Sequence, residues 1–298
     1  MPEPPSQTAT LTLHSPAKVN LSLSVLRRRP DGYHDLCSLM CPVALYDTLV
    51  LTFDKKPGIR IFCDHPEVPE TADNLAARAA ALFFDTVFSE NRPEHGRLCI
   101  RMDKQIPVGA GLGGGSSNAA AILTGLNRYY GYPLSIPSLM DLGKQIGADV
   151  SFFILGQPAW VTGIGDRVNP VPGLPRKTLV IVWPGVAVST AWVYKNLKIR
   201  LTKDEKKLNE FDLNKPIFRL DTHLFNDLES VTEAAFPVIG TIKRLLLENS
   251  AAGALMSGSG SAVFGIFSDS DTAWSAHWKL RHHPENQNWI LYVADLLV

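Results

Sequence analysis

The residues between 106 and 121 are the part of the chain best suited to chemistry. This stretch, IPVGAGLGGGSSNAAA, brings together Gly109, Gly111, Gly113, Gly114 and Gly115, and Ser116 and Ser117 follow them. Glycines let backbone N–H groups converge because no Cβ blocks the approach. A helix that begins near Ser116 adds unpaired N–H groups and the positive end of a helix dipole. The stretch therefore predicts an anion site that suits a di- or triphosphate.

Other interpretations of this stretch fit less well. A flexible linker is disfavoured, because the glycines run from an apolar strand directly into an Ala-rich helix. The pattern GxxxxGK[ST] is absent, since no lysine follows the glycines. GxGxxG matches at Gly109, Gly111 and Gly114, but no acidic residue closes a second strand about 20 residues later, as a dinucleotide site requires.

A second Gly/Ser stretch, MSGSGSAVF, covers Met256–Phe264 between apolar segments. Alone, it is typical of a tight hairpin. Together with the first stretch, it suggests two loops that face one phosphate chain.

Ionisable side chains in apolar stretches are candidates for proton chemistry. Asp149 lies in IGADVSFF, where it could act as a base, cap a helix or form a structural ion pair. The residues alone leave these roles about evenly balanced. Lys18 lies in PAKVNL on an alternating strand, and the pattern alone favours a surface lysine. Asn20 is two residues further on, so it shares a strand face with Lys18.

Tyr33 and His34 follow the turn sequence Pro30-Asp31-Gly32, in which proline presets φ and glycine tolerates a positive φ. The simplest interpretation is a hairpin tip that faces solvent.

The surrounding elements are predicted from hydrophobic periodicity and breakers. Strands are expected at 10–14, 18–26, 47–53, 59–63 (an edge strand), 98–104, 159–162, 168–171, 179–183 and 289–296. Helices are expected at 74–88, 116–130, 137–146, 189–196, 228–236, 238–249 and 272–280, with a strand–loop–strand unit at 253–267. The charged segment 198–215 is poorly periodic, which predicts a mobile surface loop.

Strands and helices mix without regular βαβ alternation, which favours an α+β fold. The densest cluster of breakers is Pro170, Pro172, Gly173 and Pro175. It predicts a boundary between an N-terminal domain over 1–170 and a C-terminal domain over 171–298. A length of 298 residues agrees with two lobes or one large α/β unit.

Composition excludes several classes of protein. Hydrophobic residues make up 45% and charged residues 19%, so the chain is not largely disordered. The 29 basic residues balance the 29 acidic ones, so no overall field favours nucleic acid or an anionic membrane. No apolar run reaches the roughly 18 residues of a spanning helix, and no signal-peptide pattern begins the sequence. We therefore expect a cytoplasmic protein without nucleic-acid or membrane partners.

The cysteines and the paired histidines do not suggest a metal site. Cys37, Cys41, Cys63 and Cys99 form no CxxC pair, which favours buried free thiols. His282 and His283 have no carboxylate or thiol cluster beside them in the sequence, so we expect surface residues.

Four separated stretches resemble, in order and spacing, the motifs of the GHMP small-molecule kinases. They are Pro16–Leu36 (PAKVNLSLSVLRRRPDGYHDL), Pro107–Ala121, Ile146–Phe153 and Met256–Phe264. The resemblance spans about residues 16 to 267. It implies a two-lobed α+β fold with a ribosomal protein S5-like N-terminal lobe and a ferredoxin-like C-terminal lobe. It also implies phosphorylation of a hydroxyl by ATP, normally with Mg²⁺, whose protein ligands no sequence feature fixes.

The resemblance also implies roles for particular residues. Asp149 is expected to accept the proton, with Lys18 as its paired cation and Asn20 as a hydrogen-bonding partner of the substrate. The segments PAKVNL and DGYH resemble family members that act on a CDP-linked methylerythritol, in the non-mevalonate route to isoprenoid precursors. Tyr33 would stack on the cytosine, His34 would hydrogen-bond to it, and Tyr194 would be a second aromatic contact. Binding of the ATP phosphates is assigned to Pro107, Val108, Gly109, Ala110, Gly111, Leu112, Gly113, Gly114, Gly115, Ser116 and Ser117, and further substrate contacts to Ser257 and Gly258.

Two positions depart from the family pattern. Ala110 stands where a third glycine is expected and could restrict φ in that turn. Asp166 stands where a glutamate is expected.

Two other functions remain open. Another GHMP kinase, of the homoserine or mevalonate type, would use a smaller substrate without a base, and the DGYH segment argues against it. A non-catalytic nucleotide-binding protein on the same fold is disfavoured by intact Lys18 and Asp149. A monomer or a weak homodimer is expected.

Overall fold

The computed structural model describes residues 10–54, 58–88, 97–197, 224–286 and 288–298. They form two compact units. Unit 1 comprises the described residues of 1–17, 45–108 and 113–156, and unit 2 those of 18–44, 109–112 and 157–298. Two long strands, β1 (Thr10–Arg28) and β2 (His34–Asp54), contribute residues to both units. The predicted domain boundary at residue 170 stays a prediction.

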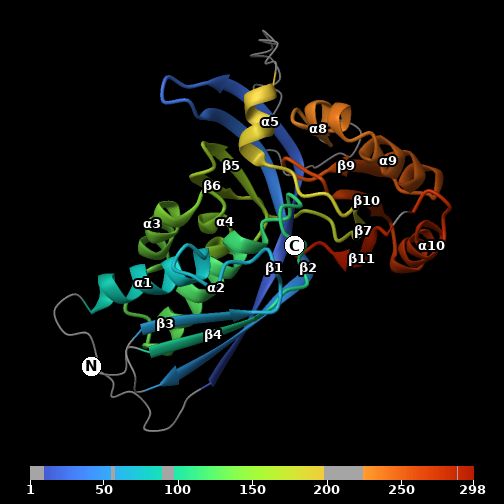
Figure 1. Cartoon of the computed structure of the whole chain (residues 1–298). Helices are drawn as coiled ribbons and strands as arrows, with labels where there is room; N and C mark the ends of the chain where they lie inside the picture. Colours follow the sequence, from blue (N-terminus) through green and yellow to red (C-terminus); the bar gives the residue numbers. More distant parts are fainter. Residues whose placement is uncertain (1–9, 55–57, 89–96, 198–223, 287) are drawn as a thin grey trace. The chain divides into compact units, whose positions relative to one another are not determined.

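Unit 1 combines helices with one end of a sheet (Figure 1). Its helices are α1 (Leu75–Val87), α2 (Gly114–Tyr129), α3 (Ile136–Ile146) and α4 (Val150–Leu155). Its strands are β3 (Gly58–Cys63) and β4 (Arg97–Asp103) with the second half of β2. Strand β4 pairs antiparallel with residues 48–54 of β2 and parallel with β3, which forms the predicted edge.

Local sequence signals explain where these helices begin. Asn74 caps α1 by accepting a hydrogen bond from the backbone N–H of Ala76 at 2.9 Å. Ser135 caps α3, and Pro137 follows in the first turn, where its missing N–H costs nothing. Small buried alanines on α1 let it pack closely on α2.

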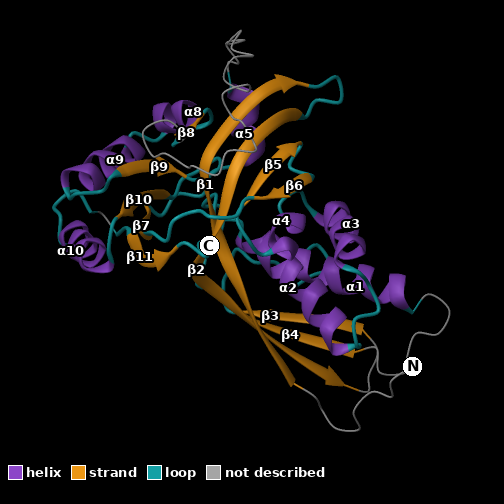
Figure 2. Ribbon diagram, turned by 180° about the vertical axis from the view of Figure 1, so that it is seen from behind, coloured by secondary structure: helices purple, strands orange, loops and turns teal. Residues whose placement is uncertain are grey.

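Unit 2 holds parts of two sheets (Figures 1 and 2). In the first, β1 pairs with β8 (Phe225–Asn226), and β2 pairs with β5 (Ala159–Gly163), which also pairs with β6 (Arg167–Pro170). The second sheet has the order β11-β7-β10-β9. Its strands are β7 (Thr178–Trp183), β9 (Gly253–Met256), β10 (Val263–Phe267) and β11 (Ile290–Asp295). The helices of unit 2 are α5 (Thr190–Asn196), α8 (Glu229–Ala235), α9 (Val238–Glu248) and α10 (Ser270–Arg281).

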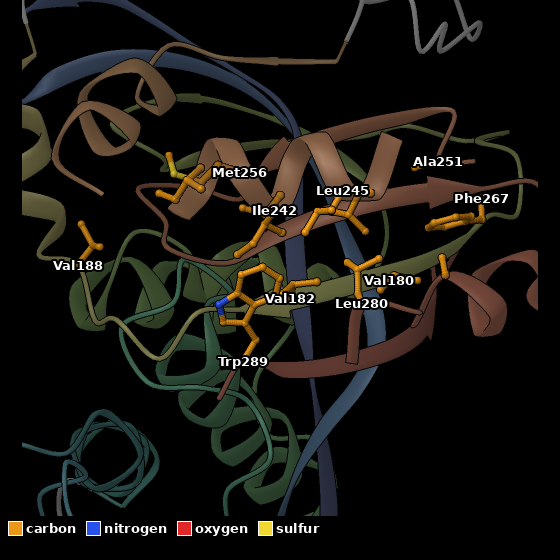
Figure 3. Close-up of a cluster of buried hydrophobic side chains, with 14 of the residues drawn as sticks. Val180, Val182, Val188, Ile242, Leu245, Ala251, Met256, Phe267, Leu280 and Trp289 are labelled. Carbon is orange, nitrogen blue, oxygen red and sulfur yellow. The ribbon is translucent and has the colours of Figure 1, made fainter. Parts of the chain in front are cut away.

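Helical periodicity accounts for the core of unit 2. Helix α9 buries Ile239, Ile242, Leu245 and Leu246 against β9 and β10. Figure 3 shows Ile242 and Leu245 on this helix, near Val180 and Val182 of β7. The buried residues of α9 recur three or four residues apart, which is the periodicity that predicted this helix.

Most predicted elements are confirmed, but the structure differs from the prediction in several places, among them β2, which begins at His34 and not at residue 47. Residues 10–28 form one continuous strand, and Lys18, Asn20 and Ser22 are buried along with the apolar residues that alternate with them. The alternation therefore does not mark a solvent-facing side. No helix was predicted over Val150–Leu155, where α4 forms and packs on α2 and α3.

The remaining expectations concern the chain's surface and its thiols. Cys37 and Cys41 are buried as expected, and burial raises the pKa of their thiols to about 11 and about 12. Cys63 and Cys99 are only half-buried. The segment 198–215 lies outside the described residues. None of the helices in the described part of the chain has the length and apolar character that crossing a bilayer requires.

Candidate functional site

Lys18 and Asn20 form the centre of a buried polar cluster in unit 2. Lys18 is only 4% exposed, which contradicts the surface position that the strand pattern favours. Its ammonium donates a hydrogen bond to Asn20 Oδ1. Asn20 Nδ2 in turn donates to Ser38 Oγ at 2.7 Å, and that hydroxyl donates to the Ser22 carbonyl oxygen at 2.6 Å. This chain of hydrogen bonds fixes the orientation of the amide and, through it, the position of the ammonium.

The two glycine loops meet beside this cluster, as their sequences suggest. Ser257 Oγ donates a hydrogen bond to the Gly111 carbonyl oxygen at 3.0 Å, and the N–H of Ala262 donates to the Ala110 carbonyl oxygen at 3.1 Å. Gly111 has a φ of +79°, and a Cβ at this position would overlap the Ser257 carbonyl oxygen. A Cβ at Gly258 would lie 3.1 Å from Lys18 Nζ and 3.4 Å from Asn20 Oδ1. Glycine at both positions is what permits this close approach.

Three side chains of the sequence Asn226-Asp227-Leu228-Glu229 hold the second loop and β1. Asn226 Nδ2 donates to the carbonyl oxygens of Met256 and Gly258 at 2.8 and 2.7 Å. Glu229 Oε2 accepts from the N–H of Met256 at 2.8 Å. Asp227 Oδ2 accepts from the N–H of Val25 on β1, also at 2.8 Å. These residues were not predicted, because their only sequence signal is a capping-type Asn-Asp pair before a helix.

In unit 1, the N-terminus of α2 has features that fit an anion. The helix begins after Gly113, whose φ is +74°, and no side chain caps it. The N–H of Ser117 donates to the Gly113 carbonyl oxygen at 2.9 Å, so only the N–H groups before it lack an intrahelical acceptor. Ser117 Oγ is buried and has no hydrogen-bond partner among the described residues. Uncapped N–H groups and a free hydroxyl are the donors that a phosphate needs.

A buried carboxylate, Asp47, ties together the two ends of the first glycine loop. It is 0% exposed. Its Oδ1 accepts from the N–H groups of Gln105 and Ile106, both at 2.8 Å. Its Oδ2 accepts from Asn118 Nδ2 on α2 at 2.9 Å and forms an ion pair with Lys104. Asp47 thus joins the strand side of the loop to its helix side, a role that was not predicted from the sequence.

Asp149 occupies the N-cap position of α4 and is half-buried. Its side chain makes no capping hydrogen bond, so the N-cap alternative does not account for it. Asp149 belongs to unit 1 and Lys18 to unit 2. Their pairing therefore stays a prediction.

The residues expected to bind a base come partly together in unit 2. The rings of His34 and Tyr194 stack with centroids 5.0 Å apart and planes 25° apart. Tyr33 is 62% exposed beside the predicted turn, where Gly32 has a φ of +88°. Burial, and then the charge of Arg28, lower the pKa of His34 from its ordinary value. At neutral pH the imidazole is therefore uncharged, with one nitrogen that donates and one that accepts.

The two departures from the family pattern have local explanations. Gly109 and Gly111 adopt positive φ, but Ala110 between them does not, so alanine fits that position. Asp166 Oδ1 accepts from the N–H of Ile164 at 3.1 Å in the turn between β5 and β6, which is a structural role. No group of three or more His, Cys, Asp or Glu side chains able to hold a metal occurs among the residues that the structure describes.

Comparisons with known proteins agree with this geometry. The N-terminal domain model of the GHMP kinases matches residues 74–157, and their C-terminal model matches 207–282. A 4-diphosphocytidyl-2-C-methyl-D-erythritol kinase from Syntrophotalea carbinolica is 50% identical over 88% of this chain and 91% of its own length. Another enzyme of this name, from Pelobacter propionicus, is 43% identical over 97% of this chain and 99% of its own length.

Solved structures show that the fold is similar as well as the sequence. A crystal structure of a 4-(cytidine 5'-diphospho)-2C-methyl-D-erythritol kinase has a TM-score of 0.76 at 33% identity and covers 96% of this chain and 99% of that one. The homoserine kinase of Cytophaga hutchinsonii has a TM-score of 0.74 at 17% identity, over 100% of this chain and 97% of that one, which shows the shared fold alone. With both glycine loops and relatives of this identity and coverage, the chain belongs to the GHMP kinases and, among them, to the 4-diphosphocytidyl-2-C-methyl-D-erythritol kinase family.

Proposed function

We propose that this chain transfers the γ-phosphoryl group of ATP to the 2-hydroxyl of 4-diphosphocytidyl-2-C-methyl-D-erythritol, giving the 2-phosphate and ADP. The observation that carries the proposal is the buried Lys18–Asn20 pair beside the contact of the two glycine loops. A buried ammonium next to glycine-lined backbone is suited to a reaction in which negative charge must be held and a hydroxyl oriented.

The residues from Pro107 to Ser117 are proposed to hold the ATP phosphates. The uncapped first turn of α2 and the unpartnered Ser117 hydroxyl supply donors. Mg²⁺ would enter with the nucleotide, because it prefers phosphate oxygens and water to a full set of protein ligands. When bound, it would neutralise charge on the transferred group.

Asp149 is proposed to accept the proton of the substrate hydroxyl, with Lys18 as its paired cation. Asn20 and the loop residues Ser257 and Gly258 are proposed to contact the substrate. Because Asn20 is fixed by Lys18 and Ser38, its amide is oriented before substrate arrives.

Tyr33, His34 and Tyr194 are proposed to recognise the cytosine. The 5.0 Å separation of the His34 and Tyr194 rings leaves no room for a base between them, since that would need about 7 Å, or two contacts of ~3.5 Å. In this arrangement the base stacks on an outer face of the pair. Hydrogen bonds from neutral His34 then supply the selectivity that stacking lacks.

An acceptor panel tests the proposal. ADP release is measured with purified enzyme, Mg²⁺-ATP and one acceptor at a time: the CDP-linked methylerythritol, mevalonate or homoserine. We expect turnover with the CDP-linked acceptor alone. Turnover of either smaller alcohol without the CDP-linked one would assign a different GHMP activity, and nucleotide binding without any turnover would favour the non-catalytic alternative.

A further inference from the structure

Helix α10 presents two tryptophans to solvent. Trp274 is 53% exposed and Trp278 is 64% exposed. Asp271, Arg281 and His282 are exposed on the same side, because these positions lie three, four or seven residues from the tryptophans. The opposite side buries Ala273, Ala276 and Leu280. We call the exposed side the tryptophan face.

The tryptophan face has the composition of an interface. Tryptophan and arginine are enriched among residues that dominate binding energy. Neighbouring imidazoles contact both indoles: Trp278 and His282 have ring centroids 4.6 Å apart, and Trp274 and His277 have centroids 5.1 Å apart. These contacts limit the side-chain freedom that binding would otherwise remove. Single apolar residues scattered over a protein surface are common and need no explanation. Two large exposed indoles on one side of one helix form a patch instead.

The charges on the tryptophan face make it complementary to itself. Asp271 lies in the first turn of α10 and Arg281 in the last, with the tryptophans between them. When a second copy of the helix runs antiparallel, with its two-fold axis level with Ala276, Trp274 lies opposite Trp278 and Asp271 lies opposite Arg281. Neither Asp271 nor Arg281 forms an ion pair with another residue in the described part of the chain. Both charges are available to a partner.

We propose that the tryptophan face binds a second copy of this chain, through antiparallel pairing of the two α10 helices about a two-fold axis. A two-fold interface of this kind uses the same patch on both copies, which the sequence of α10 satisfies. One helix pair buries less than the roughly 1,600 Å² of a standard stable interface. The dimer is therefore weak and depends on protein concentration.

Sedimentation velocity over a concentration series up to the millimolar range tests this pairing. We expect a monomer–dimer equilibrium that Trp278→Ser weakens about tenfold or more. Leu247→Ser is the matched control, because Leu247 is an exposed apolar residue on α9. It should leave the equilibrium unchanged.

A charge exchange tests the antiparallel register separately from folding. Asp271→Arg and Arg281→Asp should each reduce self-association, since each places like charges opposite one another. An equimolar mixture of the two variants should restore dimers, because every facing pair is then opposite in charge. A monomer at all concentrations, a dimer that Trp278→Ser does not affect, or a mixture that stays monomeric would each overturn the proposal.

Discussion

Lys18 is held in place by its surroundings because a buried ammonium is costly without partners. Asn20 supplies a carbonyl oxygen, and Ser38 holds the other end of that amide by accepting its N–H. A surface lysine would have many rotamers to lose when substrate binds. Lys18 has lost them already, so its charge acts at one position.

Replacement of the proposed proton acceptor should slow turnover far more than it weakens binding. Asp149→Asn keeps the size of the side chain but removes its basic oxygen. A positioned base contributes about 10²–10⁴-fold, so kcat should fall within that range, with both KM values nearly unchanged. Steady-state kinetics with the CDP-linked acceptor gives both quantities.

Lys18→Met provides the coupling test for this pair. It should also lower kcat, and the double variant should lose much less than the product of the two single effects, since both residues act on one proton transfer. Turnover of Asp149→Asn near that of the unmodified enzyme would contradict its role. Independent, multiplicative losses would contradict the pairing.

Acidification should weaken recognition of the acceptor through His34. Burial and Arg28 lower the pKa of His34 below its ordinary 6.5, so the uncharged form prevails at neutral pH. Protonation converts its accepting nitrogen into a second donor. We expect the acceptor KM to be flat near pH 7 and above and to rise below about pH 6.5.

The measurement is the acceptor KM from pH 5.5 to 8 at saturating ATP. His34→Gln removes this imidazole and keeps every other titrating group, so the acceptor KM of this variant should not rise at low pH. An identical pH profile in this variant would exclude His34 as the responsible group.

Residue types alone drew attention to the glycines, and the family resemblance to Lys18 and Asn20, but neither indicated the residues that hold them. The donors that Asp47 binds lie 57, 58, 59 and 71 residues away in the chain. Asn226 reaches the second loop across 30 and 32 residues. Such partners come together only when the strands pair, and no local sequence pattern shows which distant residues will meet. The burial of Lys18 was missed for the same reason, since alternation cannot show that both faces of a strand are covered.

At the scale of elements, the contact between the two glycine loops depends on Gly111. Gly111→Ala adds a Cβ that overlaps the Ser257 carbonyl oxygen, at a residue whose φ is +79°. The loops must separate to admit it. We expect kcat/KM to fall at least tenfold, because Ser257 and Gly258 move away from Lys18.

Gly173→Ala separates this clash from backbone strain. Gly173 has a φ of +80°, and no atom lies within 4 Å of the place that a Cβ would take, so the substitution carries the strain without the clash. It should cost about 1–2 kcal/mol of stability and leave kcat/KM unchanged. Equal kinetic effects in the two variants would show that the loop contact does not matter for activity.

Asp47 should affect both stability and nucleotide binding, because it joins the two ends of the first glycine loop. Asp47→Ala leaves Lys104 as a buried charge without its ion pair, which typically costs about 3–5 kcal/mol. Urea denaturation measures this loss. In protein that remains folded, the KM for ATP should rise while the acceptor KM changes less. An unchanged KM for ATP would limit Asp47 to a role in stability.

Elements with strong local signals were predictable, and those set by packing were not. Helices α1 and α3 begin at Asn74 and Ser135, whose side chains cap them. Helix α4 consists of VSFFIL, a β-branched and aromatic run that favours a strand locally. It is helical because it packs on α2 and α3, and tertiary packing of this kind outweighs propensity.

At the scale of the whole molecule, the fold alone does not determine the substrate. The homoserine kinase shares this fold at a TM-score of 0.74 with only 17% identity. We propose that the distinguishing residues are few and that they lie in the segment of Tyr33 and His34 and on α5, where the rings of His34 and Tyr194 stack. Substrate choice thus belongs to a local site on a common scaffold.

Ligand-linked stability tests substrate choice on the intact chain without catalysis. A ligand that binds only the folded state stabilises it by RT ln(1 + [L]/Kd), which is about 2.7 kcal/mol at a hundredfold excess over Kd. For a chain of this size, 1 kcal/mol corresponds to a shift in Tm of roughly 2–4 °C. We expect Mg²⁺-ADP and the CDP-linked acceptor each to raise Tm by several degrees in differential scanning calorimetry.

Mevalonate and homoserine at the same concentration should leave Tm unchanged, because neither carries a base for His34 and Tyr194. Tyr194→Ala should abolish the shift with the CDP-linked acceptor and retain the shift with Mg²⁺-ADP. A shift with mevalonate equal to that with the CDP-linked acceptor would show that the base does not select the substrate.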